Sequence, residues 1–306
     1  LNGVSTAPMA AFDPSTASTV MVAGSSAAFD GTAWRTLNGT NILDARGLVF
    51  DEARGAMIAV DGLNTTSVLD GGTWVPLTTT PATPPSGAHV VYDKGRARPV
   101  LLTSVLPGQP IQTYALTGAS WVSVATSTPG PMGRDSQGVV YDEVRDRTLV
   151  FSGFSIPAYD RESWVLNGST WSQIPVPSTM RGRLVDALTY DSRRGRVVVF
   201  GGRSDTGDVN DTWVLDGQNW RQVVTPPLLT PRDGAKMVFD ALRGNVMLVG
   251  GQSNRTYAET WVLEDTPGAG PADAIHVDAS NLLPDNATVL SMVARVGARR
   301  GTTPVR

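Results

Sequence analysis

Residues 187–223 read ALTYDSRRGRVVVFGGRSDTGDVNDTWVLDGQNWRQV. Short apolar and β-branched runs alternate here with turn residues, which predicts four antiparallel strands joined as a meander. We expect these strands at 187–190, 197–200, 212–215 and 220–223. A single four-stranded meander cannot cover its own faces, so the chain should contain further copies of the same unit.

Six copies are present, and an aromatic residue followed by Asp ends the first expected strand of each. The pairs are Phe12-Asp13, Phe50-Asp51, Tyr92-Asp93, Tyr141-Asp142, Tyr190-Asp191 and Phe239-Asp240, with the Asp residues 38, 42, 49, 49 and 49 positions apart. Six copies of a four-stranded unit of roughly 45 residues predict an all-β fold, a six-bladed β-propeller of four-stranded antiparallel blades.

Two further features recur within the copies. A turn containing Gly leads to a Trp in the fourth strand, and these residues are Trp34, Trp74, Trp121, Trp171 and Trp220. Large aromatic side chains of this kind are expected to pack between neighbouring blades. Turns after the repeated Asp carry Arg, for example Arg145 and Arg194, which we expect to form a solvated face.

The best-preserved copies have a Gly pair at the end of the second strand, at Gly201-Gly202 and Gly250-Gly251, and then an aromatic residue in the third. With the Trp of the fourth strand, this pattern resembles the Kelch repeat, in its bacterial, galactose-oxidase-like branch. The resemblance covers about residues 9–264. It implies a propeller, but Kelch propellers include binding modules, enzymes and adhesive domains, so the fold does not fix the function.

Catalytic residue types are scarce. The chain has no Cys and two His residues, His89 and His276. Galactose oxidase needs a Cys cross-linked to a Tyr and two His ligands for copper, so the resemblance does not extend to its catalytic residues. His89, expected on an innermost strand, is interpreted as structural. The sequence favours a non-enzymatic protein and leaves an enzyme open.

One candidate ligand site lies before the innermost strands, at one mouth of the central channel. Its expected members are Arg46, His89, Arg134, Asp135, Arg183, Arg232 and Asp233. Three of the Arg residues stand eight positions before the repeated Asp, and Arg46 is three residues out of that register. A ring of Arg could bind carboxylates or acidic glycans through paired hydrogen bonds. The alternative is a structural Arg, which Kelch repeats often carry at this place.

A second candidate site is the loop DTGDVND at 205–211. Carboxylates alternating around a Gly can supply oxygen ligands for Ca²⁺, and the candidate ligands are Asp205, Asp208 and Asn210. The loop lacks the downstream Glu of a calcium-binding hand, and it also matches the ordinary approach to the third Kelch strand. No other cofactor is expected.

The C-terminal part departs from the repeat. Copy six has no Gly–Trp ending, so its outer strand must come from elsewhere, first from the N-terminal stretch or second from the tail around 274–277. The sequence predicts a propeller over 1–264, a Pro- and Gly-rich linker over 265–273 and a β-rich segment over 274–306. That segment either completes the propeller, as a closing strand or a degenerate seventh blade, or begins a separate β domain, which the linker favours.

The formal net charge is −3 and no apolar run reaches membrane-helix length, so neither nucleic-acid binding nor membrane insertion is expected. Low charge and many Thr, Ser, Gly and Asn residues suit a secreted or cell-surface protein. We expect a binding or adhesion module of an exported bacterial protein that recognises a protein or glycan through loops on one face. The alternatives are a sugar enzyme resembling sialic acid mutarotase, with Arg and Asp at the channel mouth, and a structural subunit whose tail contacts a neighbour.

Overall fold

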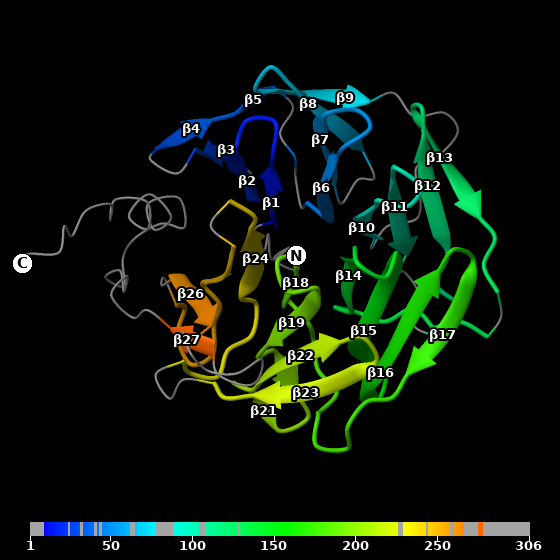
Figure 1. The fold of residues 1–306 in the computed structure, drawn as a ribbon, viewed down its shortest axis with the longest axis vertical. Helices are drawn as coiled ribbons and strands as arrows, with labels where there is room; N and C mark the ends of the chain where they lie inside the picture. The colour runs from blue at the N-terminus through cyan, green and yellow to red at the C-terminus, as the bar shows by residue number, and fades with distance from the viewer. Residues whose placement is uncertain are drawn as a thin grey trace, which may run out of the picture.

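Six antiparallel sheets surround a central axis (Figure 1). The computed structural model describes residues 9–23, 25–30, 33–39, 42, 45–61, 65–77, 88–103, 108–127, 129–225, 229–242, 244–257, 260–265 and 275–277. All regular elements in these ranges are strands, and none of these residues forms a helix that could cross a bilayer. The predicted all-β, six-bladed propeller is confirmed, and the seven-bladed alternative is not what the described sheets show.

The first three blades follow one another along the chain. Blade 1 consists of β1 (Met9–Asp13), β2 (Ser18–Ala23), β3 (Ser25–Phe29) and β4 (Trp34–Thr36). Blade 2 consists of β6 (Gly47–Asp51), β7 (Ala56–Val60), β8 (Thr66–Asp70) and β9 (Thr73–Leu77), with β5 (Asn38–Gly39) added in parallel beside β9. Blade 3 consists of β10 (Ala88–Asp93), β11 (Arg98–Thr103), β12 (Thr113–Thr117) and β13 (Ser120–Val124).

The last three blades keep the same strand order. Blade 4 consists of β14 (Gly138–Asp142), β15 (Arg147–Ser155), β16 (Ala158–Asn167) and β17 (Thr170–Ile174). Blade 5 consists of β18 (Ala187–Asp191), β19 (Arg196–Phe200), β22 (Thr212–Asp216) and β23 (Asn219–Val223), with the small hairpin of β20 (Arg203–Ser204) and β21 (Gly207–Asp208) between β19 and β22. Blade 6 consists of β24 (Lys236–Asp240), β25 (Asn245–Val249), β26 (Thr260–Asp265) and β27 (Ile275–Val277).

The innermost strands form a closed ring. In order they are β1, β6, β10, β14, β18 and β24; each contacts the next, and β24 contacts β1 (Figure 1). The outer strand of blade 6 is β27, which pairs antiparallel with β26, so the tail segment considered second supplies it. The sixth sheet thus extends past residue 264, and Asp265, the expected first linker residue, ends β26. Residues 1–8 and 278–306 lie outside the described part of the chain.

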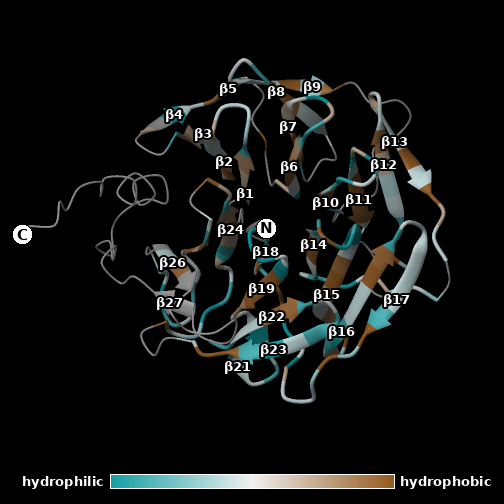
Figure 2. Cartoon of the chain, viewed as in Figure 1, coloured by the Kyte–Doolittle hydropathy of each residue, from teal (hydrophilic) through white to brown (hydrophobic). Residues whose placement is uncertain are grey.

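The core lies between the blades. Trp74 is 2% exposed and belongs to a buried cluster with Val22 of blade 1 and Met57 of blade 2. The outer-strand Trp residues of blades 3, 4 and 5 occupy matching clusters, which confirms their predicted inter-blade packing. In Figure 2 the second strands β7, β11 and β19 are largely hydrophobic, whereas the outer strand β23 carries mostly hydrophilic residues.

The Gly pair after the second strand permits a close approach of backbones. Gly201 and Gly202 both have positive φ, at 60° and 96°. A Cβ on Gly202 would lie 2.2 Å from the carbonyl oxygen of Leu184, in the loop that enters blade 5. Only Gly fits there without a shift of the backbone, which explains why the pair recurs in the repeat.

The repeated Asp is buried and holds the turn that follows it. Asp191 accepts hydrogen bonds from the backbone N–H of Arg194 at 3.1 Å and from its Nη1 at 3.0 Å. Arg145 pairs in the same way with Asp142, and it also donates from Nη1 to the carbonyl of Gly195 in blade 5 at 2.9 Å. The expectation of a solvated face is therefore wrong for Arg145 and Arg194, which are half-buried and bond to the neighbouring blade. Arg54 and Arg96, in the equivalent turns, are exposed.

The aromatic residue before the repeated Asp also connects blades when it is a Tyr. The hydrogen bonds run from Ala53 N to Tyr92 Oη, from Gly95 N to Tyr141 Oη and from Val144 N to Tyr190 Oη, at 3.0, 3.1 and 3.1 Å. They join blades 2 to 3, 3 to 4 and 4 to 5. Phe12, Phe50 and Phe239 take this place in the other three blades and have no hydroxyl. Burial raises the pKa of Tyr190 to about 12, so its hydroxyl is un-ionised at neutral pH.

Tyr190→Phe is expected to lower the free energy of unfolding by about 1 kcal/mol, because the Val144 N–H loses its acceptor. Urea unfolding measures the change. The matched control is Tyr114→Phe, whose hydroxyl bonds only to Gln112 within its own blade, at an exposed position. Equal losses in the two variants would show that the hydroxyl of Tyr190 does not hold blades 4 and 5 together.

Candidate functional site: the mouth of the central cavity

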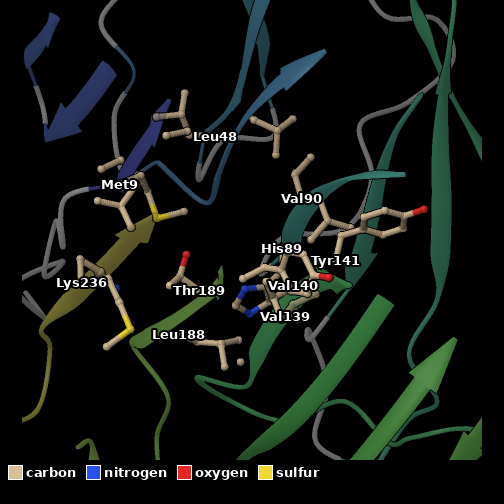
Figure 3. A pocket seen from close by; sticks show the side chains of 18 of the residues that line it. Met9, Leu48, His89, Val90, Val139, Val140, Tyr141, Leu188, Thr189 and Lys236 are labelled. Atoms are coloured by element: carbon tan, nitrogen blue, oxygen red, sulfur yellow. The ribbon is translucent and has the colours of Figure 1, made fainter. Parts of the chain in front are cut away.

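A cavity of about 1130 Å³ occupies the centre of the ring and is lined by the innermost strands. Its middle section is apolar, with Met9, Leu48, Val90, Val139 and Leu188 facing it from four or more blades (Figure 3). We call this section the throat. Polar side chains lie where the innermost strands begin, and a second polar end, with Glu52, Lys94 and Glu143, lies just after these strands end. We call the end at the beginning of the strands the mouth.

Eight polar residues line that mouth, and we call them the mouth cluster. They are Arg46, His89, Asp135, Gln137, Asp186, Asp233, Lys236 and Gln252. The repeat explains why several of them meet. Arg46, Gln137 and Asp186 stand five positions before the Asp of their blades, and His89 and Lys236 stand four before theirs. Blades 2 to 6 therefore each deliver a side chain to nearly the same height around the axis.

Two of the carboxylates are held in different ways. Lys236 Nζ donates to Asp186 Oδ1 at 2.6 Å, an ion pair that joins blade 6 to blade 5. Asp233 Oδ1 accepts the backbone N–H of Gly234 at 2.9 Å. Burial, together with the negative charges of Asp186 and Asp208, raises the pKa of Asp233. Asp233 therefore gives up its proton less readily than an ordinary Asp.

His89 is neutral at physiological pH. Burial lowers its pKa to about 4, and the neighbouring charges of Lys236 and Arg46 act in the same direction, against the opposing effect of Asp186. The imidazole faces the cavity beside Val139 and Val140 (Figure 3). It can offer one donor and one acceptor to a ligand but no positive charge.

Gln137 is the most unusual member of the cluster. It is 0% exposed, and neither its Oε1 nor its Nε2 has a hydrogen-bond partner among the described residues. Burying an amide without partners costs free energy, so a ligand that supplies them would gain. Gln137, Asp186, Lys236 and Gln252 were missed at the sequence level. For the first three, the registers that they share with Arg46 and His89 could have identified them.

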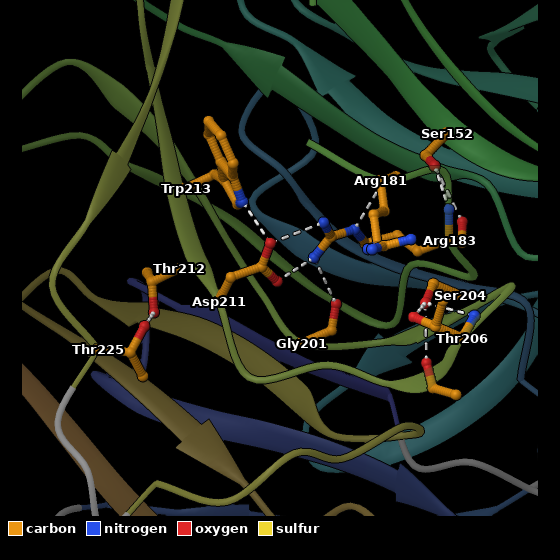
Figure 4. Close-up of polar contacts among 11 residues, drawn as sticks. Ser152, Arg181, Arg183, Gly201, Ser204, Thr206, Asp211, Thr212, Trp213 and Thr225 are labelled. Carbon is orange, nitrogen blue, oxygen red and sulfur yellow. Dashed lines mark hydrogen bonds and ion pairs between the residues drawn. The ribbon is translucent and has the colours of Figure 1, made fainter. Parts of the chain in front are cut away.

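Three of the predicted site residues lie elsewhere. Arg134, Arg183 and Arg232 are 1%, 0% and 1% exposed. Arg183 forms a two-point ion pair with Asp211, with 2.9 Å between Nη2 and Oδ2 (Figure 4). Its Nε and Nη1 donate to the carbonyls of Arg181 and Gly201, both at 3.1 Å. The guanidinium group fastens the loop entering blade 5 to the loop before β22.

The other two follow the same plan. Arg134 pairs with Glu162 at 2.8 Å and with Asp160 at 3.2 Å. Arg232 donates to the carbonyl of Gly250 at 3.1 Å, and its Cζ lies 4.1 Å from the ring centroid of Tyr257. This placement differs from the expected ring of ligand-facing Arg and matches the structural role considered as its alternative. Of the predicted members, Arg46, His89, Asp135 and Asp233 do face the cavity.

The loop considered for Ca²⁺ lies at the β20–β21 hairpin. Asp205 pairs with Arg181 at 3.3 Å, and Asn210 Nδ2 donates to the carbonyl of Leu229 at 3.4 Å. Asp208 Oδ1 is buried without a partner among the described residues. Within the ranges given above, no group of three or more His, Cys, Asp or Glu side chains could hold a metal ion. Calcium binding here stays a prediction without added support.

The repeated blade, its Gly pair and its buried Arg define a Kelch-type propeller. The sequence matches the KLHDC2/KLHL20/DRC7 Kelch-repeats domain over residues 110–266, just over half of the chain. The chain therefore belongs to the Kelch-repeat family, and the resemblance seen in its motifs is confirmed. A solved structure titled "Structure of YjhT" is similar with a TM-score of 0.63 at 9% identity, covering 89% of this chain and 97% of that one, which shows a shared fold. No curated protein matches the sequence.

Proposed function

We propose that this propeller is a non-enzymatic binding module that takes a protein ligand at the mouth cluster. Kelch propellers generally bind protein partners, which supports a protein over other ligands. The observation that carries the proposal is the buried, unpartnered amide of Gln137 at the edge of a large cavity. A preformed concave site with a few convergent polar groups above an apolar wall is the usual form of a binding site.

The site offers a ligand two kinds of gain. Polar groups of the ligand can complete the hydrogen bonding of Gln137 and Asp135, and apolar groups can enter the throat between Val90, Val139 and Leu188. Burial of apolar surface there is worth roughly 25 cal/mol per Å². Because the innermost strands of six blades fix the wall, little ordering is needed when the ligand binds.

Selection of peptides from a random display library against the intact chain tests this function, with a glycan array in parallel. Thr189 faces the cavity (Figure 3), so Thr189→Trp should obstruct it. We expect selected peptides to lose about tenfold or more in affinity for this variant. Val122→Ser is the control, because Val122 is 51% exposed on the outer strand β13. Thermal unfolding verifies that both variants fold. Peptides that bind Thr189→Trp as well as wild type would exclude the cavity as the site.

A sugar enzyme is the second candidate, and one observation favours it. Asp186 and Asp233 face the same mouth, and burial together with neighbouring carboxylates raises the pKa of Asp233 above that of an ordinary Asp. With Asp186 ionised by its pairing with Lys236 and Asp233 as the acid, such a pair can serve general acid and base catalysis. Sugar turnover or anomer interconversion that is lost in Asp233→Asn would establish the enzyme, and binding without conversion would favour the module.

The place of action is proposed from composition alone. We keep the expectation of a secreted or cell-surface protein with an adhesive or assembly role. Fractionation of the producing cells tests the location. Sedimentation of the chain over a range of concentrations tests self-assembly.

A further inference from the structure

We propose that the mouth cluster recognises a cationic side chain of its protein partner, a Lys ammonium or Arg guanidinium, whose aliphatic part lies in the throat. This inference rests on the proposed function and names the chemistry of the ligand. The ligand group inferred here is positively charged, whereas the ring of Arg expected from the sequence predicts a negatively charged ligand.

The first argument is the charge that remains once the buried Arg residues are accounted for. Arg134, Arg183 and Arg232 are committed to their own blades, as described above. The mouth is then lined by the carboxylates of Asp135, Asp186 and Asp233, and by the cations Arg46 and Lys236. Asp208 adds a further negative charge, close enough to help raise the pKa of Asp233. With His89 neutral, carboxylates outnumber cations.

The second argument is that only some of these charges form ion pairs with one another in the described residues. The Lys236 ammonium is already paired with Asp186 at 2.6 Å, whereas Asp135 is exposed and no ion pair to it is formed within the described residues. Asp233 shares its surroundings with two other carboxylates, and no ion pair of the described part reaches it either. Like charges placed together without a counterion favour a cation from outside.

The third argument is independent of charge. Gln137 is fully buried at this mouth, and neither amide atom has a partner in the described part of the chain. Its Oε1 can accept from an ammonium, which has three donors, or from a guanidinium, which has five. Its Nε2 can donate to a backbone carbonyl of the same peptide. The basic group therefore satisfies Oε1, and a carbonyl of another part of the partner can satisfy Nε2.

The shape of the cavity fits such a residue. Directly below the polar mouth the wall consists of Val90, Val139 and Leu188 (Figure 3). Lys and Arg bury their methylene stems along apolar surface while the charged end stays among polar groups. A carboxylate ligand of equal length would place its charge against Asp135 and Asp233.

Binding of three probes of six carbons each tests the inference by titration calorimetry on the intact chain. The probes are hexylamine, hexanol and hexanoate. We expect hexylamine to bind at least about tenfold more tightly than hexanoate. Asp233→Asn should weaken hexylamine binding about fivefold, whereas Asp205→Asn, at an exposed carboxylate of the β20–β21 hairpin, should leave it unchanged.

Lys236→Met gives a result that a folding defect cannot mimic, because it is expected to increase affinity. Removal of this cation frees Asp186, so hexylamine affinity should rise, by about threefold or more, which a damaged site would not produce. Affinity should fall with decreasing pH as Asp233 is protonated, at a higher pH than for an ordinary Asp. The charged groups that act on Asp233 are Asp186 and Asp208. The other charged or titratable groups of the mouth are Arg46, His89, Asp135 and Lys236, and His89 becomes cationic only near pH 4.

The probe titrations and the peptide selection together separate this inference from the proposed function. Tighter binding of hexanoate, or no saturable binding of hexylamine, would overturn the cationic ligand. Display peptides that need an open cavity but lack Lys and Arg would also overturn it, while leaving the binding module intact. If no peptide depends on Thr189, the proposed function itself fails, whichever probe binds.

Discussion

Arg183→Ala is expected to lower the free energy of unfolding by about 3–5 kcal/mol, the effect of breaking a buried ion pair from one side. The guanidinium group is fully buried, and its loss removes the counterion of Asp211 and the donor to the Gly201 carbonyl. Asp211 keeps the hydrogen bond from Trp213 Nε1. Urea unfolding at neutral pH measures the change. Arg181→Ala is the matched control, because Arg181 and its partner Asp205 are 51% and 67% exposed; it should cost less than about 0.5 kcal/mol.

The same variant has a defined pH dependence. Burial alone would raise the pKa of Asp211, but the hydrogen bonds and charge of Arg183 outweigh burial and lower it. The stabilisation is therefore present above the ordinary Asp range and is lost as pH falls through the lowered pKa. The difference between wild type and Arg183→Ala should narrow in acid. A difference that is under about 1 kcal/mol at pH 7, or that does not change with pH, would contradict the assigned ion pair.

Trp220→Ala is expected to cost about 3–5 kcal/mol, because it opens a cavity between two blades. Trp220 is 5% exposed, its ring centroid lies 4.8 Å from that of Phe151, and its Nε1 donates to Ser163 Oγ at 3.1 Å. Both partners belong to blade 4. Thermal unfolding or urea titration measures the loss, and Gln222→Ala, exposed on the same strand, is the control. If both variants lose equal stability, the packing of Trp220 between the blades does not stabilise the fold as argued.

The repeat made the fold predictable, since its signals are local. The aromatic-Asp pair ends an innermost strand and holds the next turn, so it marks the same place in every blade. Closure was harder to predict: β27 is only Ile275–Val277 and has none of the Gly–Trp pattern of the other outer strands. Its pairing with β26 depends on the position of a free edge, which the sequence does not encode as a motif.

The sequence predicted where the site lies along the strands, but not which side chains point into the cavity. Arg183 was found at its register, yet its side chain turns towards Asp211, a partner 28 residues further on, and away from the cavity. That choice is tertiary. Asp211 and Glu162 each stand two positions before a Trp, at Trp213 and Trp164. Pairing these acids with the upstream Arg would have predicted the buried ion pairs Arg183–Asp211 and Arg134–Glu162. The mouth cluster would then have remained as the candidate lining of the cavity.

The Tyr hydroxyl bonds are confined to three consecutive junctions, so the ring is not equally strong all the way round. Blades 2 to 5 form a braced arc, and backbone amides there should exchange slowly with solvent, whereas β24 and β1 belong to the remaining arc and should open more readily. Lys236 and Asp186 face each other across blades 6 and 5, where the braced arc ends. A ligand held by Asp186 and Asp233 together would bridge that end. Binding at the mouth would then be detectable as slower exchange of backbone amides around the whole ring.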